Sequence, residues 1–356
     1  MSGQGTRFLM GKRRRYKKRS NFVFALVSVV VSTIALLGFS FYKFMNAPFS
    51  SASGVASLGE ASVWKEDFTN ILLVKLDDKI DKSSNINALA ILHISNESKR
   101  YDLYKLPVDV EVEYGLNYGK GKLSEAYKVG NSDQGRGFYL LAKTILKNQA
   151  IKIDGYVALD NDGFNKLTSI IGNVDESDLS VSLRIKNYIK IPKLISSFRT
   201  VAITNLTISD VFSILGFIKN TSEGSGSVSS LNIYQVIDSQ NWDDLWESKM
   251  DISFLKKEPI KVFIANASKD PKIPGLAGWG SRVIKNLGAS VLDTQNSFVD
   301  FDENTIITDN KDLALVQKIA ETLDINKIVF VDDIDRDSGI NPQVFRTSVS
   351  VVLTGY

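Results

Sequence analysis

The chain has 356 residues, 44% of them hydrophobic and 23% charged, which is typical of a globular protein with about two domains. It contains no cysteine, so disulfides, thiolate metal sites and a cysteine nucleophile are excluded. His93 is the only histidine and lies in an apolar strand, so we expect a core or interface residue rather than a member of a triad. The net charge of +3 comes from the basic N-terminus, because acids outnumber Lys and Arg from Lys43 onward. We therefore expect no nucleic-acid partner, and any phosphate site must be a local cluster.

The first feature along the chain is an uncharged apolar segment at residues 22–42, preceded by seven basic residues between Lys12 and Arg19. As a helix it is long enough to cross a hydrocarbon core of roughly 30 Å, and the basic side of such a helix stays in the cytoplasm. The sequence therefore predicts a cytoplasmic tail at 1–21 and a transmembrane helix at 22–42. This is the pattern of a single-pass plasma membrane protein with its later domains outside the cell and membrane lipid as a partner. A cleaved secretory signal and a buried core helix are the alternatives.

Small polar residues at 43–69 predict a stalk, and the first folded domain is predicted at 70–240. Apolar runs predict strands, and helical spacing of apolar residues predicts helices between them. We expect strands at 71–76, 88–94, 101–106, 153–159 and 231–237, and helices at 123–129, 137–146, 161–171 and 207–219. The helix at 207–219 begins with the capping-box sequence Thr207-Ile208-Ser209-Asp210. Strands that alternate with helices indicate an α/β layered domain.

A tether is predicted at 241–258, where the sequence is acidic, and a second domain at 259–356. In this last segment the apolar pattern predicts the order strand, helix, strand, strand, helix, strand and a final strand. That order favours a small α+β domain whose helices pack on one face of a sheet.

Short motifs in this order resemble a known family. Asn70-Ile71-Leu72-Leu73 followed by Asp77, then Leu106-Pro107-Val108-Asp109, and then the segment from Lys122 to Tyr127 resemble successive elements of the LytR-CpsA-Psr family. In the tail, the segments Val262–Ala267 and Pro274–Ala277 resemble the opening of the LytR C-terminal domain. The resemblance covers most of the chain beyond the stalk and implies an LCP-like α/β domain followed by a LytR C-terminal-like domain.

The resemblance implies a reaction and its partners. Members of that family transfer glycopolymers from a polyprenyl pyrophosphate carrier to peptidoglycan in the cell envelope, so polyprenyl-linked glycopolymer and peptidoglycan are the implied partners. Such chemistry needs cations around the phosphates and carboxylates that hold magnesium. By resemblance, the catalytic residues are Asp77, Asp109 and Lys122, and Asp77 and Asp109 are the ligands of a magnesium ion.

The family's catalytic arginines are not retained in this sequence. Asn85 and Val108 stand where the family has arginine, and Asn87 stands where it has aspartate. The sequence therefore predicts a membrane-anchored, extracytoplasmic protein that binds lipid-linked or wall glycopolymer, a degenerate homologue with little catalysis. The alternatives are an active glycopolymer phosphotransferase, favoured if three or more basic side chains converge on Asp77 and Asp109, and a structural or interaction protein of the cell wall, favoured by an aromatic groove around Trp279.

Overall fold

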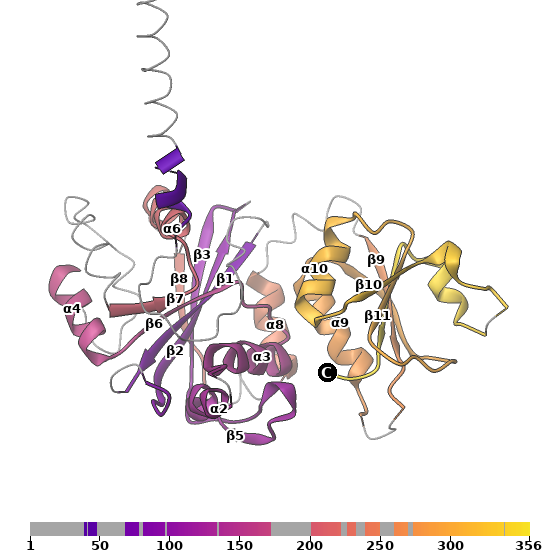
Figure 1. Ribbon diagram of the computed structural model, residues 1–356, viewed down its shortest axis with the longest axis horizontal. Helices are drawn as coiled ribbons and strands as arrows, with labels where there is room; N and C mark the ends of the chain where they lie inside the picture. The colour runs from indigo at the N-terminus through magenta and orange to yellow at the C-terminus, as the bar shows by residue number, and fades with distance from the viewer. Residues whose placement is uncertain are drawn as a thin grey trace, which may run out of the picture.

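Two β-sheets, each covered by helices, make up the described part of the chain (Figure 1). The computed structural model describes residues 39–40, 42–47, 68–77, 81–96, 98–133, 135–171, 201–221, 226–232, 239–249, 260–269, 273–337 and 339–356. The first sheet has six strands and the second has five, and a small hairpin of two strands accompanies the first.

The first sheet has the strand order β7-β6-β1-β2-β3-β8. Its strands are β1 (Phe68–Leu76), β2 (Ile86–Ser95), β3 (Arg100–Leu106), β6 (Gly155–Leu159), β7 (Ala202–Thr204) and β8 (Gly226–Ser230). The central strand β2 runs antiparallel to both β1 and β3, while β6 runs parallel to β1 and β8 runs parallel to β3. The carboxyl ends of β1, β3, β6 and β8 therefore lie at one edge of the sheet.

Both faces of this sheet are buried under helices, as the apolar runs of the central strands predict. One face packs against α2 (Ala126–Ser132), α3 (Gly137–Gln149) and α8 (Ser239–Lys249). The other face packs against α6 (Ile208–Asn220), and α4 (Asn161–Ile171) follows β6. The predicted capping box of α6 is confirmed: the Thr207 hydroxyl accepts from the Asp210 N–H, and the Asp210 carboxylate accepts from the Thr207 N–H.

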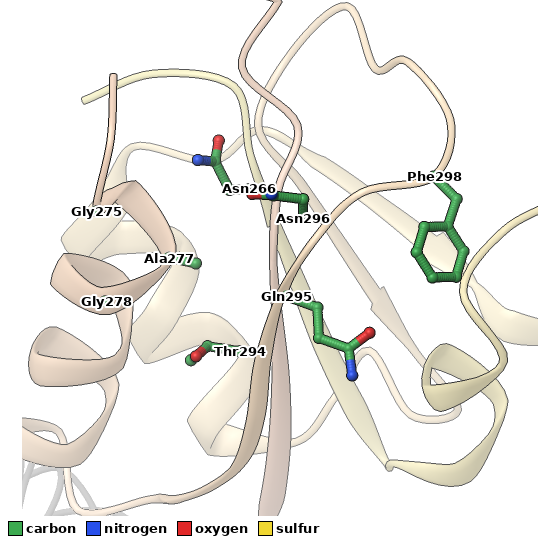
Figure 2. Close-up of a pocket in the computed structure, with 8 residues that line it drawn as sticks. All are labelled: Asn266, Gly275, Ala277, Gly278, Thr294, Gln295, Asn296 and Phe298. Carbon is green, nitrogen blue, oxygen red and sulfur yellow. The ribbon is translucent and has the colours of Figure 1, made fainter. Parts of the chain in front are cut away.

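The second sheet has the order β10-β9-β13-β11-β12. Its strands are β9 (Lys261–Asn266), β10 (Ser290–Asn296), β11 (Thr305–Thr308), β12 (Lys327–Phe330) and β13 (Val349–Leu353). Helices α9 (Leu276–Asn286) and α10 (Ala314–Leu323) share one hydrophobic core with this sheet. An open pocket lies between the start of α9 and the ends of β9 and β10 (Figure 2).

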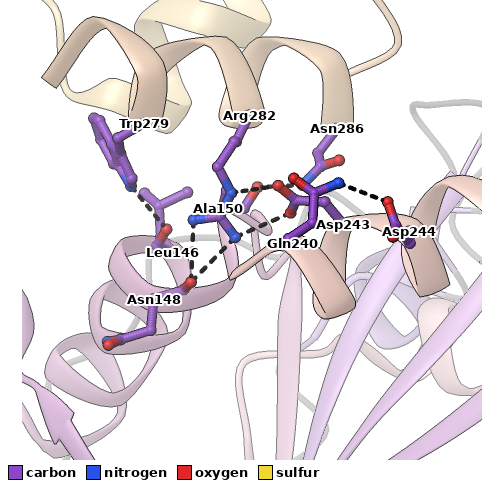
Figure 3. A network of polar contacts seen from close by, with 9 residues as sticks. All are labelled: Leu146, Asn148, Ala150, Gln240, Asp243, Asp244, Trp279, Arg282 and Asn286. Carbon is purple, nitrogen blue, oxygen red and sulfur yellow. Dashed lines mark hydrogen bonds and ion pairs between the residues drawn. The ribbon is translucent and has the colours of Figure 1, made fainter. Parts of the chain in front are cut away.

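The two sheets are joined through α3, α8 and α9 (Figure 3). Arg282 on α9 makes a two-point contact with the Asp243 carboxylate at 2.6 and 3.0 Å and also donates to the Asn148 carbonyl. The Trp279 indole N–H donates to the Leu146 carbonyl at 3.3 Å. Helix α8 thus occupies the first part of the segment that the sequence assigns to a tether. Its Trp242 and Trp246 are fully buried against the first sheet.

The predicted membrane span is not supported. A crossing helix needs about 20 apolar residues, and no helix among the described residues is long and apolar enough to cross a membrane. This finding contradicts the predicted single-pass membrane protein. Most of the segment at 22–42 lies outside the described residues. Of this segment, the structure describes only residues 39–40 and 42.

His93 lies in the core, as its apolar strand predicts. Its ring is 2% exposed and sits 4.9 Å from the Trp246 ring, centroid to centroid. The Nδ1 atom lies 2.8 Å from the Asn70 side-chain oxygen, so a neutral imidazole donates its Nδ1–H there. Burial lowers the pKa of His93 from 6.5 to about 4, against an opposing effect of the Asp102 carboxylate and together with a smaller effect of Arg100.

This pKa predicts an acid-sensitive fold. Between pH 6.5 and 4 the unfolded chain binds a proton at His93 that the folded chain does not, so this contribution to stability is complete above pH 6.5 and is lost as the pH falls. We expect the free energy of unfolding to drop by about 2 kcal/mol more between pH 7.5 and pH 5 in the wild type than in His93→Gln. Denaturant melts at both pH values measure it. Equal losses in the two proteins would contradict the prediction.

A second prediction concerns the close approach of α2 and α3. A Cβ at Gly137 would lie 2.6 Å from Tyr127 Cδ2 and 2.7 Å from the Tyr127 carbonyl oxygen, whereas a Cβ at Gly216 on α6 would meet no atom within 4 Å. Gly137→Ala should therefore lower the free energy of unfolding by about 1–3 kcal/mol. Gly216→Ala, the matched control, should leave it unchanged or raise it by up to about 1 kcal/mol. Thermal melts compare the two, and a stable Gly137→Ala variant would show that the helices move apart freely.

Candidate functional site

The predicted site residues lie at the edge of the first sheet where β1 and β3 end. Asp77 directly follows β1, and Asp109 follows β3 by three residues. Because β2 lies between these strands, their axes are two strand spacings apart, roughly 10 Å. Asp160 follows β6 at the same edge, where its carboxylate accepts from the Gly163 N–H at 2.7 Å and caps α4.

Asp109 and Lys122 are brought together by a hairpin. The strands β4 (Glu111–Glu113) and β5 (Lys120–Lys122) pair antiparallel, and Leu123 and Ser124 donate their N–H groups to the carbonyls of Val110 and Val108. This places Lys122 Nζ 3.5 Å from Asp109 Oδ1. The two side chains are 58% and 79% exposed, so the pair adds little to stability and remains accessible to a ligand.

Asp77 has a different set of contacts. Its N–H donates to the Asn85 carbonyl at 3.0 Å, and its Oδ1 accepts from the Asn85 N–H at 3.0 Å. The Asn161 side chain donates to the Asp77 carbonyl. Asp77 therefore closes the connection between β1 and β2 through these hydrogen bonds with Asn85 and Asn161.

Few of the described side chains near the predicted site could coordinate a divalent ion. Among the described residues, no three His, Asp or Glu side chains gather closely enough to hold a metal ion. Magnesium is commonly held by one or two carboxylates together with the phosphate oxygens of a substrate. The assignment of Asp77 and Asp109 as magnesium ligands remains a prediction.

Two lysines that the sequence reasoning missed lie at the same edge. Lys75 is the second-last residue of β1, and Lys105 is the second-last residue of β3. They pair with Ala88 and Ala90 of β2, two positions on the same face, so both lysines belong to the α6 face of the sheet. Lys75 Nζ lies 4.5 Å from the centre of the Phe164 ring on α4. The signal was present in the sequence, because each lysine interrupts an otherwise apolar strand end.

An aromatic groove around Trp279 would favour a structural or interaction protein, but Trp279 makes other contacts in the structure. Its ring packs edge-on against Tyr356, with centroids 5.1 Å apart, and its indole N–H is bonded to the Leu146 carbonyl. Trp279 therefore contributes to the contact between the two halves of the chain.

Comparison with known proteins finds a family model that is similar to the first part of the chain. Residues 50–179 match the model of the LytR_cpsA_psr family, so the resemblance read from the motifs at Asn70, Pro107 and Lys122 is confirmed for this segment. The resemblance of the tail to the LytR C-terminal domain, and the loss of catalytic arginines, remain predictions.

One relative is the polyisoprenyl-teichoic acid–peptidoglycan teichoic acid transferase TagV of Bacillus subtilis (strain 168). It is 26% identical to this chain over 191 residues, which are 48% of this chain and 47% of that protein. The alignment therefore spans about half the length of each. Solved structures with some likeness include B. subtilis TagV (16% identity, TM-score 0.40, 52% of this chain and 96% of that chain) and TagT bound to LI-WTA (17% identity, TM-score 0.38, 55% and 97%). At such TM-scores the structural likeness carries no argument about activity.

The contacts of Asp77 yield a prediction that separates its structural role from its charge. Asp77→Ala removes the acceptor of the Asn85 N–H and should cost about 1 kcal/mol of stability. Asp77→Asn keeps an acceptor oxygen in place and should change stability by less than about 0.5 kcal/mol. Denaturant melts of the three proteins measure both effects. If the asparagine variant is as unstable as the alanine variant, the carboxylate charge itself holds the turn.

Proposed function

We propose that the first domain binds a cell-envelope glycopolymer through the phosphates of its polyprenyl carrier, at the edge where β1 and β3 end, and transfers it weakly or not at all. The observation that carries this proposal is that the described basic side chains near the ends of β1 and β3 are lysines. Lys75 and Lys105 lie near the ends of β1 and β3 on the α6 face, and Lys122 lies on the hairpin beside Asp109. Arg100, the only arginine in the six strands of the sheet, begins β3 at the opposite edge.

The difference between lysine and arginine decides between binding and transfer. A lysine ammonium attracts phosphate as a point charge, which is enough for binding. A leaving pyrophosphate concentrates charge on several oxygens, and guanidinium groups meet them with paired hydrogen bonds that lysine does not make. Loss of one oxyanion donor typically costs about 10²–10³ in rate, so replacement of several arginines should leave little turnover.

Magnesium would bind together with the phosphates of the ligand in this proposal. Asp77 and Asp109 are the residues that would hold it, and the phosphates of the ligand would complete its oxygen shell. The ion would neutralise part of the phosphate charge at the edge.

An active transferase is the second candidate, and the similarity to TagV favours it. The name of that protein describes transfer of teichoic acid from a polyisoprenyl carrier to peptidoglycan. If this chain does the same, Lys75, Lys105 and Lys122 supply the cations that arginines supply elsewhere in the family.

One experiment distinguishes the two candidates. Wild type, Lys122→Gln, Lys105→Gln and Asp109→Ala are incubated with a polyprenyl-pyrophosphate-linked oligosaccharide and magnesium, and both bound ligand and released lipid phosphate are measured. We expect wild type to bind without detectable release, and each lysine variant to bind about tenfold more weakly.

Lys327→Gln is the matched control. Lys327 is 45% exposed and pairs with Glu303 at 3.6 Å on the second sheet, much as Lys122 pairs with Asp109. Its substitution should leave binding unchanged. Release by wild type that Asp109→Ala abolishes would establish the transferase instead, and equal binding by wild type and all lysine variants would overturn the proposed edge.

A further inference from the structure

The second domain contains an open pocket that the proposed function does not use. It has a volume of about 510 Å³, which lies in the range of ligand sites. It sits outside the carboxyl ends of the parallel strands β9 and β10, beside the start of α9, and this is the place where open α/β sheets commonly bind ligands. Its described lining residues are Asn266, Gly275, Ala277, Gly278, Thr294, Gln295, Asn296 and Phe298.

None of the described lining residues is charged. Amide and hydroxyl side chains both donate and accept hydrogen bonds, so they match a ligand whose groups do both. A phosphate or carboxylate ligand would lack a cation there. An entirely apolar ligand would cover polar side chains without replacing their hydrogen bonds to water.

Two of the lining side chains are available for a ligand. Within the part of the chain that the structure describes, the Thr294 hydroxyl and the Asn296 amide have no hydrogen-bond partner, and both residues are exposed. Figure 2 shows Thr294 on the side of β10 that faces the first turn of α9. By contrast, Gln295 is fixed by bonds to Asp293 and Asn341, both at 2.6 Å, so it holds the wall of the pocket.

The remaining walls are small on one side and aromatic on the other. A Cβ at Gly278 would meet no atom within 4 Å, so the glycine leaves open space along α9. Phe298 is 65% exposed and lies beyond the end of β10 (Figure 2). An aromatic face that is free to solvent packs well against the C–H face of a pyranose ring.

From this combination we infer that the pocket beside α9 binds a neutral oligosaccharide, with sugar hydroxyls on Thr294 and Asn296 and a sugar ring on Phe298. This site is separate from the edge of the first sheet, and it needs neither a lipid nor a phosphate group. It would give the chain a second binding site for a glycan.

The test uses the full chain and N-acetylglucosamine tetramer, a neutral soluble glycan, titrated by calorimetry. We expect saturable binding by wild type and a loss of affinity of about tenfold or more in Gly278→Leu, which fills the open space, and in Phe298→Ala. Because Gly278 is helical and unobstructed, its substitution should not lower the melting temperature, which is measured in parallel.

Gly216→Leu is the control, since Gly216 is an equally unobstructed helical glycine on α6. It should bind the tetramer as wild type does. The inference is overturned if wild type does not bind, if Gly278→Leu binds equally well, or if inorganic phosphate displaces the glycan. Each of these results leaves the proposed function of the first domain standing, because the probe carries no pyrophosphate and the variants lie outside the first sheet.

Discussion

Helix α3 is shared by two hydrophobic cores, and the arrangement of the whole described chain depends on it. Phe138, Leu141 and Ile145 pack against the first sheet, while Leu146 at the end of the helix and Ala150 just beyond it are part of the core that contains α9 and α10. Apolar burial is the dominant favourable term in folding. One short helix therefore fixes the second sheet against the first, and the polar contacts of Arg282 then set its orientation, since a two-point guanidinium–carboxylate contact has a defined geometry.

Three buried hydrogen-bond donors between α8 and the first sheet lack a partner among the described residues. Tyr104, Trp242 and Trp246 form an aromatic cluster with centroids 5.4 to 6.4 Å apart. Their hydroxyl and indole donors have no hydrogen-bond partner among the described residues. An unpaired buried donor is destabilising, so the packing of three large rings has to outweigh it. Helix α8 is therefore held to the first sheet by ring packing rather than by hydrogen bonds.

The two candidate sites follow the same structural rule with opposite chemistry. Each lies beyond the carboxyl ends of parallel strands, a position that the topology of an α/β sheet leaves open to ligands. At the edge of the first sheet the side chains are charged, with Lys122 near Asp109 and Lys75 near the end of β1. In the pocket beside α9 they are neutral amides, a hydroxyl and an aromatic ring. A glycan on a phosphate carrier has phosphates that match the charged edge and sugar groups that match the neutral pocket.

The sequence by itself determined the local elements and the resemblance to a family. The capping box at Thr207 fixed the start of α6, because its bonds span only three residues. Apolar runs gave the central strands, and the motifs around Asp77, Asp109 and Lys122 pointed to the LytR_cpsA_psr match. These signals are short in range, so neighbouring residues suffice to read them.

Only the tertiary structure decided which of these residues meet. The pairing of Asp109 with Lys122 depends on how a hairpin folds back. The position of Asp77 relative to that pair depends on β2 lying between β1 and β3. The placement of Lys75 and Lys105 on one face depends on strand register, and the burial of Trp242 and Trp246 turned an acidic segment that looked like a tether into part of the core. Such contacts join residues far apart along the chain. Their free energy depends on burial and register, which the spacing of residues in a sequence does not encode.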